Sequence, residues 1–115
     1  MDAKATQVAA GAVLDRAGAV CVIGAGPAGL AAARALKVRG IDYDQVERHT
    51  GVGGIWDIDA PGSPMYEAAH FISSKTMSAF VGHPMGDELP DYPSHRQILA
   101  YLKSFAEQLY FLCSV

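Results

Sequence analysis

The clearest hydrophobic pattern in this chain is an unbroken apolar run followed by a helix-forming segment. Residues 19–23 are all apolar, which predicts a β-strand over residues 18–24 that is covered on both faces. A helix is predicted from Pro27, a favourable first helical residue, to about Arg39. Basic residues gather toward the end of this helix, and Gly40 is placed to cap it.

The middle of the chain alternates polar connections with short apolar segments. A second strand is predicted over residues 41–47, although its centre is more polar than a fully buried strand prefers. Glycines and prolines predict loops over residues 50–64 and 82–93. Between these loops, residues 65–71 are expected to form a turn or a short helix, and residues 73–80 fit no single element.

A final amphipathic helix is predicted near the C-terminus. Ser94 and Gln97, three residues apart, have the spacing of a capping box, and the helix is expected to continue to about Leu109. One apolar stripe runs along it at spacings of four, three and four residues: Ile98, Leu102, Phe105 and Leu109.

Three glycines join the first strand to the first helix. Gly24 is expected to permit the tight turn, Gly26 to let a pyrophosphate approach the backbone, and Gly29 to let the helix pack closely on the strand. Pro27 and Ala28 complete the pattern and begin the helix, whose N-terminal N–H groups favour an anion. The pattern predicts an α/β fold with a Rossmann-like βαβ dinucleotide-binding unit. A tight turn without a ligand is the alternative.

An acidic residue at the end of the second predicted strand supports the dinucleotide interpretation. Glu47 follows Gly29 by 18 residues, close to the spacing of about 20 for a carboxylate that binds ribose hydroxyls. Since a carboxylate repels a ribose 2′-phosphate, the site should prefer FAD or NAD to NADP. An exposed strand-end acid is the alternative. Arg48 is grouped with the cofactor-binding candidates, although a solvated surface charge is its simpler interpretation.

A second glycine cluster follows closely. Gly53 and Gly54 would leave the backbone free to lie against a bulky cofactor, and Trp56 comes directly after them. The alternative is a flexible loop whose tryptophan fills part of the core.

Composition argues against several other functions. The net charge of −3 offers no basic surface for nucleic acid. No run approaches the roughly 20 apolar residues of a membrane span, and residues 1–17 are interpreted as a leader without the pattern of a signal peptide. Cys21 and Cys113 show no disulfide framework, so a reducing, cytoplasmic location is the simplest interpretation. No metal site is expected, because the histidines lack metal-ligand spacing: His49, His70, His83 and His95.

Over residues 18–106 the chain resembles the N-terminal part of flavin-containing monooxygenases. The resemblance rests on motifs in order: the glycine pattern of residues 24–29, Glu47, Gly53-Gly54-Ile55-Trp56, Ser74-Lys75 and Tyr92-Pro93-Ser94-His95. Baeyer–Villiger-type and other two-dinucleotide FAD/NAD(P) oxidoreductases share the first two motifs, and they remain the alternative among enzymes. No Cys-x-x-Cys pair follows Glu47, which counts against a disulfide-reductase-like protein.

The resemblance implies an FAD site and an oxygenation reaction. By analogy, the three glycines of the first turn would hold the pyrophosphate, Glu47 the ribose, and Gly53, Gly54 and Trp56 the part of FAD toward the flavin. Family members use NADPH to reduce the flavin and pass one atom of O2 to a small molecule, such as an amine, a sulfide or a ketone. No catalytic residue is assigned, because Ile72 occupies the position where many members have asparagine.

The resemblance also implies that the fold is incomplete. Val115 precedes the family's second glycine-rich turn, which binds NADPH, so residues 18–115 are expected to be a partial FAD-binding domain. The isolated chain is therefore expected to bind FAD weakly or not at all, to leave NADPH unoxidised, and to pair with a missing C-terminal portion. A truncated, non-catalytic nucleotide-binding remnant is the alternative.

Overall fold

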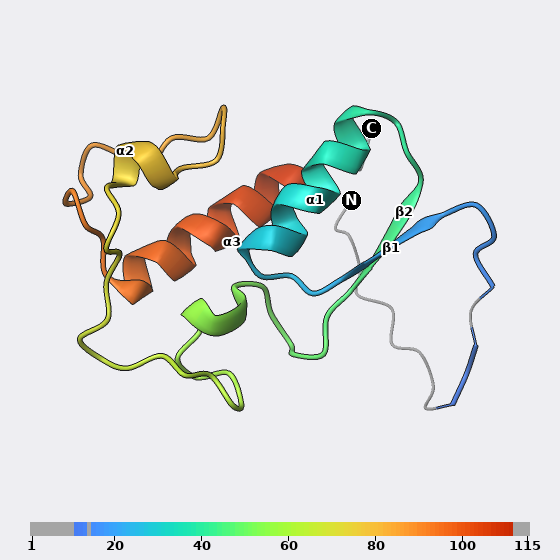
Figure 1. The fold of residues 1–115 in the computed structure, drawn as a ribbon, viewed down its shortest axis with the longest axis horizontal. Helices are drawn as coiled ribbons and strands as arrows, with labels where there is room; N and C mark the ends of the chain where they lie inside the picture. The colour runs from blue at the N-terminus through green and yellow to red at the C-terminus, as the bar shows by residue number, and fades with distance from the viewer. Residues whose placement is uncertain (1–10, 14, 112–115) are drawn as a thin grey trace.

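The structure of the chain is a computed structural model that describes residues 11–13 and 15–111. Most of the predicted leader and Cys113 therefore lie outside the described residues. The elements in chain order are β1 (Val20–Ile23), α1 (Pro27–Val38), β2 (Tyr43–Val46), the 3-10 helix η1 (Gly54–Trp56), α2 (Lys75–Ser78) and α3 (His95–Phe111). Figure 1 shows α1 lying along α3, with the two strands toward one end of the molecule and α2 toward the other.

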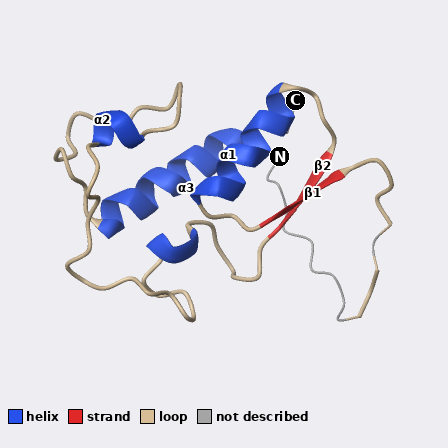
Figure 2. Ribbon diagram, in the orientation of Figure 1, coloured by secondary structure: helices blue, strands red, loops and turns tan. Residues whose placement is uncertain are grey.

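The two strands and the helix between them form a βαβ unit, as predicted. β1 and β2 are parallel, and Val20 is paired with Tyr43. The backbone N–H of Val20 donates to Asp42 O at 3.0 Å, and that of Gly24 donates to Val46 O at 2.8 Å. Helix α1 contacts both strands. A short parallel pair joined by a helix is the beginning of a dinucleotide-binding fold, and Figure 2 shows this arrangement.

The prediction that the first strand is covered on both faces is wrong for this structure. Val22 is only 8% exposed because it packs toward α1, whereas Ile23 is 85% exposed and Cys21 is exposed. Side chains alternate between the two faces of a strand. The sheet formed by the described residues has two strands, and α1 lies on one face of it. Covering the other face requires further polypeptide, and an apolar strand sequence cannot provide that by itself.

Helix α1 ends with the hydrogen bonds of a Schellman motif. Gly40 has a φ of +66° and its N–H donates to Lys37 O at 3.0 Å, while the N–H of Ile41 donates to Leu36 O at 3.0 Å. These two bonds satisfy carbonyls that the end of a helix leaves without partners. The predicted capping role of Gly40 is therefore confirmed.

Helix α3 begins with the predicted capping box. The N–H of Ser94 donates to Gln97 Oε1 at 2.9 Å, and the N–H of Gln97 donates to Ser94 Oγ at 3.3 Å. The predicted apolar stripe is buried, and it packs against Leu30 and Ala33 of α1 to form the core. Its four residues are Ile98, Leu102, Phe105 and Leu109.

Long-range hydrogen bonds hold the connections between η1 and α3 in place. The Lys75 ammonium donates to Gly86 O at 3.1 Å and to Leu89 O at 2.6 Å. The Tyr101 hydroxyl donates to His83 O at 2.6 Å and accepts from the N–H of Phe80 at 2.8 Å. Local sequence pattern does not specify such contacts, which explains why residues 73–80 resisted prediction.

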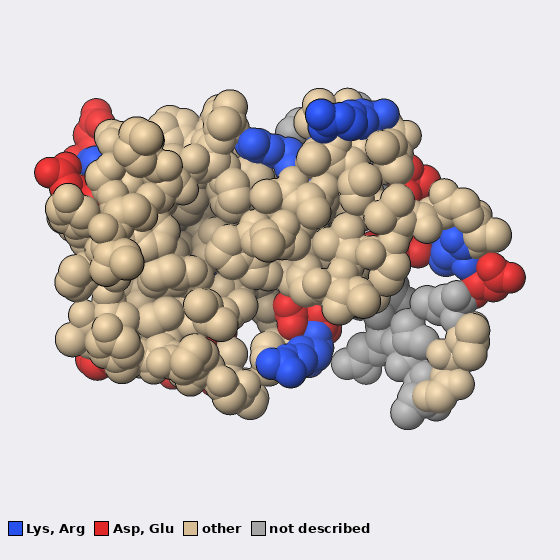
Figure 3. All heavy atoms as spheres, viewed as in Figure 1, with Lys and Arg blue, Asp and Glu red and all other residues tan. Residues whose placement is uncertain are grey.

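The surface is mostly uncharged on the face seen in Figure 3, where lysine and arginine side chains form small separate groups. No helix among the described residues is long and apolar enough to cross a membrane.

Candidate dinucleotide site

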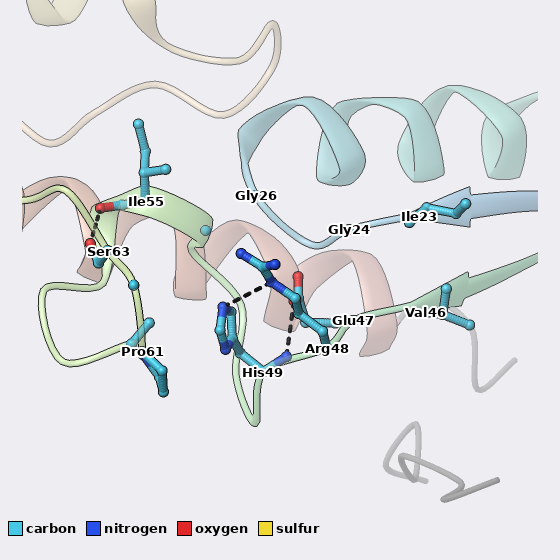
Figure 4. Close-up of a pocket in the computed structure, with 13 residues that line it drawn as sticks. Ile23, Gly24, Gly26, Val46, Glu47, Arg48, His49, Ile55, Pro61 and Ser63 are labelled. Carbon is cyan, nitrogen blue, oxygen red and sulfur yellow. Dashed lines mark hydrogen bonds between the residues drawn. The ribbon is translucent and has the colours of Figure 1, made fainter. Parts of the chain in front are cut away.

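A cavity of about 610 Å³ opens at the carboxyl ends of the two strands. In parallel α/β sheets this end is the usual place for a ligand. Its walls come from the strand ends, from the first glycine turn and from the loop after η1 (Figure 4). The lining residues are Ile23, Gly24, Gly26, Val46, Glu47, Arg48, His49, Gly54, Ile55, Ala60, Pro61, Gly62 and Ser63.

The first glycine turn is tightly constrained by its own backbone. Gly24 has a φ of +106°, in the region that L-residues rarely adopt. A side chain at Gly29 would collide with the carbonyl oxygen of Gly24, so only glycine permits this approach of α1 to β1. The Gln45 amide Nε2 donates to the same carbonyl at 2.9 Å. This bond gives the unexpectedly polar centre of β2 a structural role beside the turn.

The second glycine cluster lies directly against the first. The N–H of Gly53 donates to Ala25 O at 2.9 Å. A Cβ on Gly54 would lie 3.0 Å from the Cα of Gly26, so the two backbones touch. On the other side of the loop, a Cβ on Gly53 would collide with Leu99 of α3. The two motifs therefore form one surface of bare backbone, supported from α3.

Glu47 connects the end of β2 to the glycine turn. Its Oε2 accepts from the N–H of Ala25 at 2.7 Å, and its Oε1 accepts from the N–H of His49 at 3.0 Å. Burial raises the pKa of Glu47, but backbone hydrogen bonds from His49, Ala25 and Arg48, with the charge of His49, outweigh it, and the net pKa lies below the ordinary value. The carboxylate is thus held ionised beside the turn.

The structure brings only some of the predicted site residues to the cavity. Gly24, Gly26, Glu47, Arg48 and Gly54 line it. The remaining candidates do not appear among its lining residues: Pro27, Ala28, Gly29, Gly53 and Trp56.

Two of the candidates make contacts that bear on their interpretation. Trp56 is half-buried, and its ring meets that of Phe71 edge-on at 5.0 Å between centroids, which fits the core-filling alternative. The Arg48 Nε donates to His49 Nε2 at 3.2 Å, and the Arg48 side chain is exposed. Ile72, at the position where relatives were expected to have asparagine, is 94% exposed.

Sequence reasoning missed one wall of the cavity, formed by residues 60–63. This loop folds back toward the strand ends, and Ser63 Oγ donates to Ile55 O at 2.9 Å to close it. The Pro61-Gly62 pair predicts a turn but not its position in space. His49 was missed as well, because a histidine without metal-ligand spacing gives no signal for a cavity wall. No group of metal-ligating side chains occurs among the described residues.

The geometry suits a phosphate-containing ligand with a sugar beside it. The start of α1 has N–H groups without helical partners and a partial positive charge, both favourable to phosphate. A fixed carboxylate nearby can accept hydrogen bonds from hydroxyl groups. The family model described as "Flavin-binding monooxygenase-like" matches residues 17–115. The chain belongs to this family.

Named relatives of this flavin-binding monooxygenase-like chain agree with the match. Flavin-containing monooxygenase 3 of Rattus norvegicus is 33% identical over 93 residues, which are 77% of this chain but 18% of the rat protein. The structure of S-allyl-L-cysteine S-oxygenase from Allium sativum matches with a TM-score of 0.68 and 28% identity, over 78% of this chain and 25% of the garlic enzyme. An oxidized steroid monooxygenase bound to NADP matches with a TM-score of 0.64 and 28% identity, over 79% of this chain and 17% of its own. The chain thus spans less than a quarter of the rat relative that it matches.

Proposed function

We propose that this chain is the FAD-binding N-terminal segment of a flavin-dependent monooxygenase. The observation that carries the proposal is the bond from the N–H of Ala25 to Glu47 Oε2 at 2.7 Å, because it places a carboxylate against the glycine turn. In this arrangement Gly24, Gly26 and the start of α1 face the pyrophosphate, and Glu47 faces the adenosine ribose.

A second observation that supports FAD is the close contact between the two glycine motifs. Gly26 and Gly54 meet so closely that a Cβ on Gly54 would lie 3.0 Å from Gly26 Cα, and both residues line the cavity. Bare backbone at this point lets a pyrophosphate lie close to the turn. Pro27, Ala28 and Gly29 start the helix, whose N-terminus attracts the phosphates. We assign Gly53 and Gly54 to the part of FAD that leads from the pyrophosphate toward the flavin. Trp56, which contacts Phe71, supports the loop that carries these two glycines. We place Arg48 at the edge of the cavity.

The whole reaction that we propose is NADPH- and O2-dependent oxygenation of a small molecule with a soft nucleophilic atom or a ketone. Bound FAD supplies the redox and oxygen chemistry. The residues of this chain bind and orient the adenine half of the cofactor. The names of the relatives support the substrate class, since one is an S-oxygenase and another a steroid monooxygenase bound to NADP. We assign NADPH binding to parts of the family fold outside the matched residues.

We also propose that residues 18–115 are part of a larger FAD-binding domain whose remaining portion pairs with β1. The hydrogen bonds to β2 use the N–H groups of Val20 and Gly24, so those of Cys21 and Ile23 point to the opposite edge. Unpaired edges and an exposed apolar face favour a further strand and its covering layer. The free thiol of Cys21 fits a reducing, cytoplasmic location. Imaging of a fluorescently tagged protein tests that location.

A chimera tests the proposed function. The matched part of this chain replaces the corresponding segment of the garlic S-oxygenase, and the purified protein is assayed for flavin absorbance, NADPH oxidation and S-oxygenation. We expect the chimera to retain FAD. Gly26→Ala should weaken FAD binding by about tenfold or more, because a methyl group then covers backbone that faces the pyrophosphate. The matched control is Gly51→Ala, where an added Cβ meets no atom within 4 Å.

The result that overturns the proposal is a chimera that unfolds cooperatively, yet contains no flavin. The 115-residue chain alone is expected to hold FAD weakly or not at all and to leave NADPH unoxidised. Flavin that copurifies with it, or NADPH oxidation above the buffer rate, would contradict this second part.

A further inference from the structure

His95 is almost completely buried at the start of α3, with 1% of its surface exposed. Its Nε2 lies 3.1 Å from Glu67 O. A carbonyl oxygen can only accept a hydrogen bond, so Nε2 carries the proton and donates. The other ring nitrogen, Nδ1, has no hydrogen-bond partner among the described residues. The buried ring therefore connects the start of α3 to the backbone of Glu67.

Backbone hydrogen bonds attach the same segment to the start of α3. The N–H of His95 donates to Ala69 O at 3.0 Å, and the N–H of Phe71 donates to Pro93 O at 2.9 Å. Together with the ring of His95, these bonds fix residues 67–71 against the first turn of the helix. The ion pair of Arg96 with Glu67 at 3.0 Å is exposed and adds little.

This fixed segment supports the second glycine cluster. The ring of Phe71 meets that of Trp56 at 5.0 Å. The N–H of Trp56 donates to Gly53 O at 3.1 Å, and the N–H of Gly53 donates to Ala25 O at 2.9 Å in the first glycine turn. Continuous contacts therefore lead from His95 to the turn. Leu99, one helical turn after His95, touches Gly53 from the same helix.

We propose that His95 is a positioning residue for the dinucleotide site. Its ring locks residues 67–71 onto α3, and these residues hold η1 so that Gly53 and Gly54 stay against the first glycine turn. That the site binds a dinucleotide rests on the proposed function, but the effect of His95 on the position of Gly53 and Gly54 can be tested without FAD. This role gives the histidine that follows Tyr92-Pro93-Ser94 a function although it does not line the cavity.

The test compares two substitutions of His95 in the full chain. His95→Leu keeps the bulk and removes the donor, whereas His95→Gln retains an N–H near the position of Nε2. His70→Leu is the matched control, since His70 is exposed and its Nδ1 contacts the carbonyl of its own neighbour, Phe71. Amide hydrogen exchange is measured at Gly53, whose N–H bonds to Ala25 O, and at Phe80, whose N–H bonds to the Tyr101 hydroxyl.

We expect His95→Leu to accelerate exchange at Gly53 by about fivefold to tenfold, the effect of losing one buried hydrogen bond, with Phe80 unchanged. His95→Gln should restore most of the protection, and His70→Leu should have no effect. Acrylamide quenching of Trp56, the one tryptophan of the chain, should increase in parallel in His95→Leu.

Equal acceleration at Gly53 and Phe80 would overturn the proposal, because it would show general loss of stability and not a local displacement. Unchanged exchange at Gly53 would overturn it as well. In the chimera, the FAD dissociation constant should rise with His95→Leu and recover with His95→Gln. If Gly53 responds as expected while the unaltered chimera binds no FAD, the positioning role is supported and the proposed function alone is refuted.

Discussion

Replacing Gly29 with alanine should destabilise the chain, although alanine is normally the better helix residue. Within a helix, Gly→Ala stabilises by about 1 kcal/mol. At Gly29, however, the new methyl group would collide with the carbonyl oxygen of Gly24, a backbone atom that cannot rotate away. Helix α1 must then move off β1, and such overpacking costs about 1–3 kcal/mol. Because the new methyl group meets rigid backbone, the cost lies at the upper end of this range, about 2–3 kcal/mol, and the net loss in the free energy of unfolding is about 1–2 kcal/mol.

Thermal unfolding followed by circular dichroism measures this loss. For a chain of 115 residues, the midpoint should fall by about 4 °C for each kcal/mol. Gly51→Ala is the matched control, since its Cβ meets nothing within 4 Å and the midpoint should hold or rise slightly. Gly26→Ala is intermediate, with a Cβ at an ordinary 3.5 Å from Gly54 Cα, and should change the midpoint little. An unchanged or higher midpoint in Gly29→Ala would refute the steric argument.

Three further substitutions have defined expected results. Glu47→Gln should lose about 1–2 kcal/mol at pH 7, because an amide can accept from only one of the two N–H groups that the carboxylate satisfies. Since folding lowers the pKa of Glu47, the carboxylate stabilises the fold above its unfolded pKa, and this contribution is lost as the pH falls through the folded pKa. Urea titrations should therefore show the difference in unfolding free energy between wild type and Glu47→Gln shrinking below about pH 4.5. A difference that does not change with pH would contradict the lowered pKa. Ser94→Ala should cost about 1 kcal/mol in the same assay through loss of the N-cap of α3, and Gln97→Ala in the Ser94→Ala background should add less than it does alone. Tyr101→Phe should cost about 1–3 kcal/mol, because its hydroxyl bonds both His83 O and the N–H of Phe80, and wild-type stability would exclude that role.

Local sequence patterns determined the helices of this protein and the place of its first glycine turn. An apolar run, a glycine turn, and a proline at the start of α1 act within a few residues, so both ends of that helix follow from short-range hydrogen bonding and sterics. The stripe on α3 could likewise be read from its spacing, because the helical period places those side chains on one face. The ribose-binding role of Glu47 stays a prediction, but its place beside the turn follows from parallel pairing of two neighbouring strands.

Tertiary structure alone decided how the separate motifs meet. That Gly54 touches Gly26, that residues 60–63 close a cavity, and that His95 is buried against Glu67 all depend on contacts between residues far apart in the chain. Sequence periodicity carries no information about such pairings, because it records the neighbours along an element and not across the fold. The open face of β1 has the same origin. Burial of its apolar residues is favourable, but it occurs only where other polypeptide lies against them.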